Sequence, residues 1–189
     1  MRLKTFGTGY TENSNLYVGI DQSYSGFAIT VLAEDQSYKT TVARFETRGP
    51  ERLSEIQNYL IDTFHEAMGK GKVKDVAIEG YAFGSQMANM LGELGGVVKL
   101  TLYKLKGLEN GNHPLIVPPT SLKKYVTGKG QGSSKGQILL HVYKKWGVEF
   151  SDDNAADSYG LAHIVSGQAK LSYEKEVYEK LQTADHRER

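Results

Sequence analysis

Four acidic residues stand where predicted elements end or begin. Asp21 ends the apolar run LYVGID, and Glu79 ends the apolar run VAIE. Asp153 and Asp157 flank the start of the helical pattern NAADSYGLAHIV, and a spacing of four residues places them on one helix face. Because open α/β sheets place their sites at strand ends, we expect these four side chains to converge on one point.

Converging carboxylates repel one another unless a cation lies between them. The chain contains no cysteine, which excludes thiol catalysis and every cysteine-containing zinc site. Oxygen ligands alone suit Mg²⁺ or Mn²⁺. Two such ions ~4 Å apart activate a water and stabilise the leaving oxygen of a phosphodiester. The four acids therefore predict a two-metal nuclease site.

Taken one at a time, the same acids have ordinary structural roles. Asp21 in DQSYSG is a typical turn residue. Either Asp152 or Asp153 is a candidate N-cap, and Asp157 complements the helix dipole. The prediction of a metal site thus depends on the joint pattern of the four positions.

Charge is distributed unevenly along the chain. Its 189 residues carry a net charge of only +1, but residues 94–148 contain nine lysines and a single acid, Glu109. A basic segment beside an acidic remainder indicates an anionic partner bound next to carboxylates. Nucleic acid bound at a metal site is the combination that fits.

The Gly-rich segment TGKGQGSSKG, residues 127–136, precedes a predicted helix. Such a loop presents backbone N–H groups to phosphate. A lysine in the first turn of a helix is unfavourable for the helix dipole, so its presence indicates that it binds an external anion. The candidate DNA-binding lysines here and in the helix before it are Lys123, Lys124, Lys129 and Lys135. The alternative is that the Gly-rich segment is a flexible, solvated loop.

Two aromatic residues, Tyr81 and Phe83, follow Glu79 directly in GYAFGSQ. Aromatic side chains on a loop beside a nuclease site wedge between bases or stack on them. The alternative is that they cap the hydrophobic core.

The segment 86–106 has helical spacing but more apolar residues than one buried face requires. Each glycine inside a helix costs about 1 kcal/mol relative to alanine, and close approach of a second helix would explain that cost. We therefore expect a homodimer interface here, formed by Gly92, Leu94, Gly95, Gly96 and Val98. The alternative is that the glycines mark a kink or a break in the helix.

The elements that must position these residues follow the pattern of an α/β domain. Residues 16–33 read as two strands with a turn near 22–25, and residues 38–47 read as a third. Further strands are expected at 73–79 and 115–117, and helices at 50–68, 86–106, 120–127, 134–146 and 154–170. The prediction is a flexible N-terminal arm over 1–15, a nuclease domain over 16–170 and a charged, helical tail over 171–189.

Four segments, in order, resemble the RuvC family of Holliday junction resolvases, which have the RNase H-like fold. The segments are VGIDQSYSGFAIT, AIEGYAFG, VPPTSLKKYVTGKGQGSSKGQILLHVYKKWG and DDNAADSYGLAHI, and the similarity covers residues 16–168. The first motif is shared with sugar kinases and actin-like ATPases, but the third is specific. The resemblance, including small phage-type members, implies a mixed five-stranded sheet of three antiparallel and two parallel strands flanked by helices.

The resemblance also implies an activity. Family members are homodimers that bind four-way DNA junctions, hold Mg²⁺ or Mn²⁺ on four acids and nick two strands symmetrically. They are crossover junction endodeoxyribonucleases of DNA recombination and repair. By motif position, Asp21, Glu79 and Asp157 match three acids, and Lys135 matches a lysine near the scissile phosphate. The fourth acid is Asp153, with Asn154 as a neutral alternative ligand.

Three other functions remain as alternatives. One is a nuclease for branched DNA in general, and a second is a junction-binding protein without catalysis on the same fold. A third, a phosphotransferase of the actin-like type, requires two such domains, and only one fits in this length.

No apolar run approaches the ~20 residues that span a bilayer and the N-terminus has no signal-peptide core, so a cytoplasmic location, in a bacterial or phage-infected cell, is expected.

Overall fold

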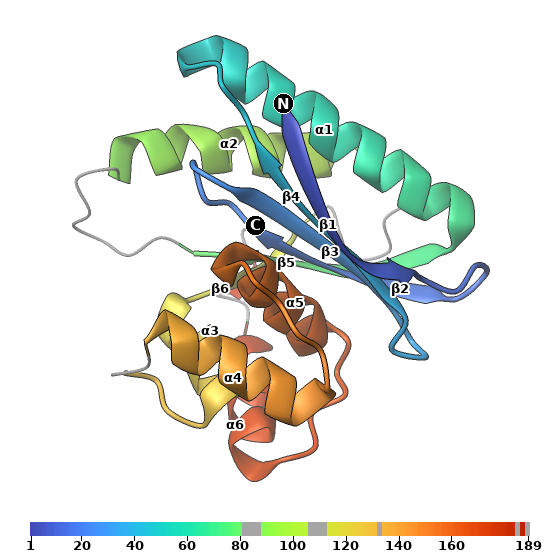
Figure 1. Ribbon diagram of the computed structural model, residues 1–189, viewed down its shortest axis with the longest axis vertical. Helices are drawn as coiled ribbons and strands as arrows, with labels where there is room; N and C mark the ends of the chain where they lie inside the picture. Colours follow the sequence, from blue (N-terminus) through green and yellow to red (C-terminus); the bar gives the residue numbers. More distant parts are fainter. Residues whose placement is uncertain (81–87, 106–112, 132–133, 184–185, 188–189) are drawn as a thin grey trace.

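The computed structural model describes residues 1–80, 88–105, 113–131, 134–183 and 186–187. These residues form one mixed β-sheet with helices packed on both faces (Figure 1). Of the helices formed by these residues, two cover one face of the sheet and four lie on the other, which gives three layers. The expectation of an α/β fold with a mixed sheet is confirmed.

In the described ranges the sheet contains six strands, one more than the sequence predicts. They are β1 (Arg2–Gly9), β2 (Asn15–Asp21), β3 (Phe27–Ala33), β4 (Tyr38–Arg44), β5 (Lys72–Glu79) and β6 (Leu115–Val117). Their order is β1-β4-β3-β2-β5-β6; β5 runs parallel to β2 and to β6, and the other pairs are antiparallel. The carboxyl ends of β2 and β5 therefore meet at one edge of the sheet.

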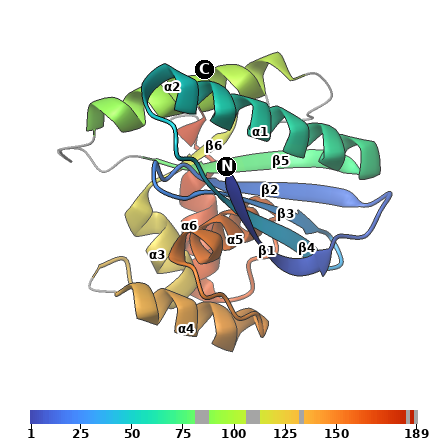
Figure 2. The same ribbon diagram turned by 45° about the horizontal axis from the view of Figure 1, so that its top comes forward.

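The additional strand, β1, lies in the segment expected to be a flexible arm. It pairs with β4 and forms the edge of the sheet opposite β6, beginning at the N-terminus (Figure 2). Phe6 anchors it, because its ring packs edge-on against Phe150 with centroids 5.1 Å apart. Most other residues of β1 are polar or glycine, and for this reason the sequence lacks the apolar alternation that marks a strand.

The helices form two groups, each covering one face. α1 (Gly49–Lys70) and α2 (Ala88–Lys104) cover the first face and enclose one hydrophobic core. On the second face lie α3 (Pro119–Thr127), α4 (Lys135–Trp146), α5 (Asp153–Val165) and α6 (Ser172–Leu181), around a second core. Among the described residues, none of these helices is both long and apolar enough to cross a bilayer.

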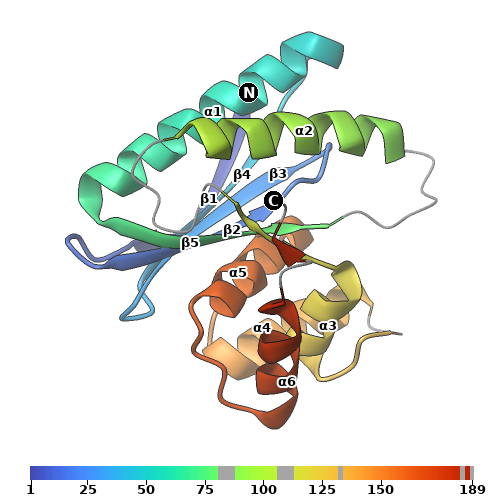
Figure 3. The same ribbon diagram turned by 180° about the vertical axis from the view of Figure 1, so that it is seen from behind.

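The C-terminal residues return to the sheet after α6, beside β6 (Figure 3). Arg187 forms an isolated antiparallel bridge with Leu115, and its guanidinium contacts both carboxylate oxygens of Asp75 at 2.5 and 2.9 Å. Arg187 thus pairs with part of an edge that would otherwise expose backbone groups.

Gly19 in β2 sets how closely α5 approaches the sheet. A Cβ atom at this position would lie 2.0 Å from the Ser158 carbonyl oxygen and 2.4 Å from the Ala162 nitrogen. Both atoms belong to the backbone of α5, so neither can rotate away. Only glycine permits this contact, which holds α5 directly against the strand that ends in Asp21.

We expect Gly19→Ala to destabilise the protein by roughly 3 kcal/mol or more, because the overpacked helix must move as a unit. Urea unfolding measures the change. Gly69→Ala is the matched control: a Cβ there meets nothing within 4 Å, and the substitution should stabilise the helix by up to ~1 kcal/mol. Equal stability of Gly19→Ala and the wild type would contradict this account of the β2–α5 contact.

Candidate active site

Three of the four predicted acids meet at the carboxyl ends of β2 and β5. One carboxylate oxygen from each of Asp21, Glu79 and Asp157 lies within 4.8 Å of the others. Asp21 and Glu79 are the last residues of the two parallel strands, and Asp157 comes from the second turn of α5. The parallel register places Ile20 beside Ile78, so the two following acids emerge together.

Burial and mutual repulsion control the protonation of this cluster. The pKa of the Asp21 carboxyl is raised well above its usual value, first by burial and then by the charges of Glu79, Asp157 and Asp153. Burial raises the pKa of Glu79 to about 7, although the Lys123 charge and a hydrogen bond with Asp21 act in the opposite direction. Without a cation, the cluster therefore holds protons near neutral pH.

A divalent cation fits this donor set. The ligands offered are carboxylate oxygens alone, as Mg²⁺ and Mn²⁺ prefer. A buried group of like charges is stable only when protons or a cation offset the repulsion. Asp21, Glu79 and Asp157 are the residues that would hold the ion.

Gln22, which no sequence motif marks as a functional residue, links the two strand ends. Its side-chain Nε2 donates to the Glu79 carbonyl oxygen at 2.7 Å, and Gln22 is buried. This bond joins β2 and β5 beyond their last backbone pair, Ile20 and Ile78. It therefore fixes the separation between the Asp21 and Glu79 carboxylates.

The N-terminus of α5 is fixed by Asp152, one of the two N-cap candidates. Its Oδ1 accepts from the backbone nitrogen of Asn154 at 3.1 Å, and its Oδ2 contacts the Arg44 guanidinium at 2.6 Å. Capping satisfies an otherwise unbonded N–H group of the first turn. The ion pair also joins α5 to β4, so the helix that carries Asp157 is anchored to the sheet.

Asp153 and Asn154, the two candidates for a fourth ligand, lie outside the group of three oxygens. Asp153 is close enough for its charge to raise the pKa of Asp21. The Asn154 side chain lies against the turn between β2 and β3, because a Cβ at Gly26 would be 2.6 Å from its Nδ2. The charge of Asp153 acts on the site; which of the two residues completes the ligand set stays a prediction.

The predicted DNA-binding lysines differ in their surroundings. Lys123 on α3 lies near enough to Glu79 to lower its pKa. Lys124 instead forms an ion pair with Glu176 of α6 at 2.5 Å. Lys129 is exposed in the loop after α3. Lys135 begins α4, but its side chain is outside the described part of the structure, as are Tyr81 and Phe83.

The predicted dimer interface on α2 is partly wrong. Leu94, Gly95 and Val98 are buried within the protomer, where Leu94 and Val98 join the core beneath α1 and α2. Gly92 and Gly96 lie on the other side, where a Cβ would meet nothing within 4 Å. The sequence could not separate the two faces because both are apolar.

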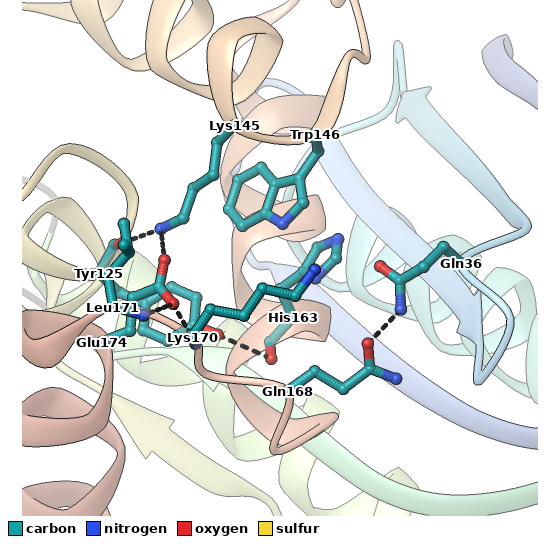
Figure 4. A pocket seen from close by; sticks show the side chains of 9 residues that line it. All are labelled: Gln36, Tyr125, Lys145, Trp146, His163, Gln168, Lys170, Leu171 and Glu174. Carbon is teal, nitrogen blue, oxygen red and sulfur yellow. Dashed lines mark hydrogen bonds and ion pairs between the residues drawn. The ribbon is translucent and has the colours of Figure 1, made fainter.

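A cavity of about 280 Å³ lies between α3, α4, α5 and the segment before α6 (Figure 4). Its polar groups largely bond to one another: Lys145 pairs with Glu174 and donates to the Tyr125 carbonyl oxygen at 2.5 Å. Glu174 also accepts from the backbone nitrogens of Lys170 and Leu171 at 2.6 and 2.9 Å. None of the three clustered acids lines it, so this cavity is not the candidate active site.

His163 on the wall of this cavity is almost completely buried and stacks on Trp146, with ring centroids 4.3 Å apart. Burial lowers its pKa to about 3, and the charges of Lys145 and Lys170 act in the same direction. The unfolded chain therefore binds the proton more tightly, so stability is lost as pH falls from 6.5 toward 3.

We expect this histidine alone to lower the free energy of unfolding by up to ~1.4 kcal/mol per pH unit below pH 6.5. Urea unfolding of the wild type and His163→Phe between pH 4.5 and 7.5 measures it as the difference between the two curves. His65→Phe, at an exposed position of α1, is the control. A difference that stays constant with pH would show that His163 does not titrate in this way.

Comparison with known proteins gives a match in structure alone. No protein-family model matches the sequence, and no curated protein matches it either. The structure is similar to that of Thermus thermophilus RuvC, with a TM-score of 0.63 and 18% sequence identity. The match covers 92% of this chain and 98% of the RuvC chain. It is also similar to T. thermophilus RuvC in complex with a Holliday junction substrate, with a TM-score of 0.62, 18% identity, and 88% and 95% of the two chains covered. The chain therefore has the RuvC fold, an RNase H-like fold, in which its three clustered acids lie at the carboxyl ends of β2 and β5.

Proposed function

We propose that this protein is a RuvC-family endonuclease that depends on divalent metal, binds four-way DNA junctions as a homodimer and resolves them by paired symmetric nicks. The observation that carries the proposal is the cluster of Asp21, Glu79 and Asp157 within a RuvC fold. The structure of RuvC bound to a Holliday junction supports the choice of substrate.

The residues of the site have separate roles in this proposal. Asp21, Glu79 and Asp157 hold Mg²⁺ or Mn²⁺, with two ions per site and Asp153 as the further ligand. Bound divalent ions supply an activated water and stabilise charge on the leaving oxygen of the phosphodiester. Lys123, beside Glu79, attracts the phosphate backbone toward an otherwise negative site. Gln22 and Asp152 keep the strand ends and α5 in place.

Homodimer formation is supported by the outer face of α2. Gly92, Gly96, Leu100 and Tyr103 recur at spacings of four, four and three, which place them along one side of the helix. Leu100 is 50% exposed and Tyr103 59%. A partner helix could approach closely over the two glycines and cover the two large apolar side chains.

Leu100→Glu should therefore convert the dimer to a monomer, because burying an isolated charge between two helices is unfavourable. Sedimentation equilibrium of the wild type and the variant measures the change. Leu140→Glu, at an exposed position of α4 on the other face of the sheet, should leave the association constant unchanged. Identical monomeric masses for all three proteins would exclude the dimer.

The test of the proposed function uses three labelled substrates with Mg²⁺. They are an immobile four-way junction, a linear duplex of the same sequence and an RNA–DNA hybrid. Paired symmetric nicks in the junction alone are the expected result. Equal cutting of all three would retain the nuclease but exclude junction specificity. Tight junction binding without nicks in Mg²⁺ or Mn²⁺ would identify a binding protein without catalysis.

A further inference from the structure

We propose that strand β1 is a second DNA-contact surface, on which Arg2 and Lys4 bind backbone phosphates of the same DNA that reaches the acidic cluster. This inference depends on the proposed nuclease function. It assigns a role to the N-terminal segment, which lies outside the motifs that resemble RuvC.

The strand register places Lys4 in the same row as Asp21. Lys4 is opposite Val42 in β4, Val42 is opposite Ala28 in β3, and Ala28 is opposite Asp21 in β2. Directly opposed residues project from the same face of a sheet. Three inter-strand steps of roughly 4.8 Å separate the two ends of the row, a distance of roughly 14 Å.

Contacts of β1 identify that face as the one covered by α5. The Lys4 Nζ donates to Ser151 Oγ at 2.8 Å, just before α5 begins. Phe6, two residues further along and on the same face, packs against Phe150. The cations of β1 therefore lie on the side of the sheet from which Asp157 reaches the metal-binding cluster.

Arg2 precedes Lys4 by two residues and lies directly opposite Arg44. It is therefore nearer than Lys4 to the end of the sheet at which β2 and β5 carry the acids. Like charges in a cross-strand pair are destabilising. Arg44 is committed to the buried carboxylate of Asp152 at 2.6 Å. Within the part of the chain that the structure describes, Arg2 pairs with Glu46, and the two side chains are 84% and 71% exposed; such a pair contributes little in water.

The partner of Lys4 is a neutral hydroxyl group, so its charge is not neutralised within that contact. Its Nζ also lies 5.1 Å from the centroid of the Phe6 ring. Within the described residues, the contacts of these two exposed cations are thus an exposed carboxylate, a hydroxyl group and an aromatic ring. An external anion would offset the repulsion between Arg2 and Arg44 and use both charges.

DNA has the charge spacing that matches this surface. A duplex carries one negative charge per ~1.7 Å of its axis, so 14 Å corresponds to about four base pairs. A duplex arm with one phosphate at the acids would have further phosphates within this distance, and we infer that these reach the cations of β1. Lys123 attracts the backbone from the β5 side of the cluster, and Arg2 and Lys4 would do so from the β4 side.

The experiment measures junction binding by the double variant Arg2→Gln/Lys4→Gln in EDTA, from 50 to 200 mM salt. Loss of two phosphate contacts should lower the slope of log K against log salt by about 2 and weaken binding roughly tenfold or more at low salt. The charge-matched control, Lys175→Gln/Lys180→Gln on α6, should keep the wild-type slope. Arg2→Lys/Lys4→Arg should also keep it, because the charges remain.

A wild-type slope and affinity in Arg2→Gln/Lys4→Gln would overturn the inference, as would an equal change in the α6 control. So would a lowered slope in the charge-conserving variant, since that result would indicate that β1 has unfolded. Junction nicking by the wild-type protein from the same preparation tests the proposed function separately. If the wild type nicks junctions but the β1 variant binds them normally, the β1 surface is excluded and the proposed function stands. If the wild type does not bind DNA, both proposals are excluded.

Discussion

Replacement of Asp157 by asparagine is expected to abolish nicking of four-way junctions while leaving their binding intact. The amide keeps the shape of the side chain but removes one of the three charges that would hold a divalent ion. Metal catalysis supplies several kcal/mol of transition-state stabilisation, so the rate should fall by about 10³-fold or more. Binding should stay equal or become slightly tighter, because a negative charge near the phosphate is lost.

Nicking rates under single-turnover conditions and junction binding in EDTA measure the two effects separately. Asp62→Asn, at an exposed acid of α1, is the matched control and should behave as the wild type. Asp153→Asn and Asn154→Ala, made alongside, decide which of the two is the fourth ligand. Nicking by Asp157→Asn at a rate near that of the wild type would remove this residue from the metal site.

The second large effect concerns the stability of the protein without metal. Folding raises the pKa of Asp21 and brings that of Glu79 to about 7, so the native state binds these protons more tightly than the unfolded chain. This contribution is fully present below the unfolded pKa values near 4 and is lost as pH rises through the folded ones. For Glu79 alone the loss between pH 4.5 and 8 is on the order of 3 kcal/mol.

Divalent metal should reverse that loss. In EDTA, Asp21→Asn is expected to be more stable than the wild type at pH 8, because it removes a carboxylate that must ionise inside the cluster. In Mg²⁺ or Mn²⁺ at 100 times the dissociation constant, the wild type should gain ~2.7 kcal/mol, and the variant should gain much less.

Urea unfolding at pH 5 to 8.5, with and without metal, provides the measurement. The difference between wild type and Asp21→Asn isolates the carboxylates from His163, which acts with the opposite sign below pH 6.5. A wild-type protein whose metal-free stability, relative to Asp21→Asn, does not fall as pH rises would contradict the raised pKa values. Equal metal stabilisation of both proteins would show that the ion binds elsewhere.

The sequence was sufficient where the pattern is local. Apolar alternation and helical spacing located the five main strands and the helices, because burial imposes a period of two on strands and 3.6 on helices. Asp21 and Glu79 could be paired in advance, since both end apolar runs that read as neighbouring strands. Either Asp152 or Asp153 could cap α5 by composition alone, and only the hydrogen bond from Asn154 decides for Asp152.

Tertiary contacts determined the rest. β1 is a strand only because β4 offers a free edge and Phe150 a surface for Phe6; nothing within residues 2–9 requires it. Leu94 and Val98 are core residues because α1 and the sheet cover that face of α2, whereas Gly92 and Gly96 lie on the open one. The helical repeat shows which residues share a face, but the packing of the other elements determines which face is buried.

The amino-acid sequence by itself thus determined the chemical class of the site: carboxylate oxygens at strand ends, next to a lysine-rich segment. Only the tertiary structure decided which acids meet. Asp157 joins Asp21 and Glu79 because Gly19 lets α5 lie against β2, and Arg44 holds the start of that helix to β4. A linear sequence records which donors a chain has, whereas their distances depend on contacts between residues more than a hundred positions apart.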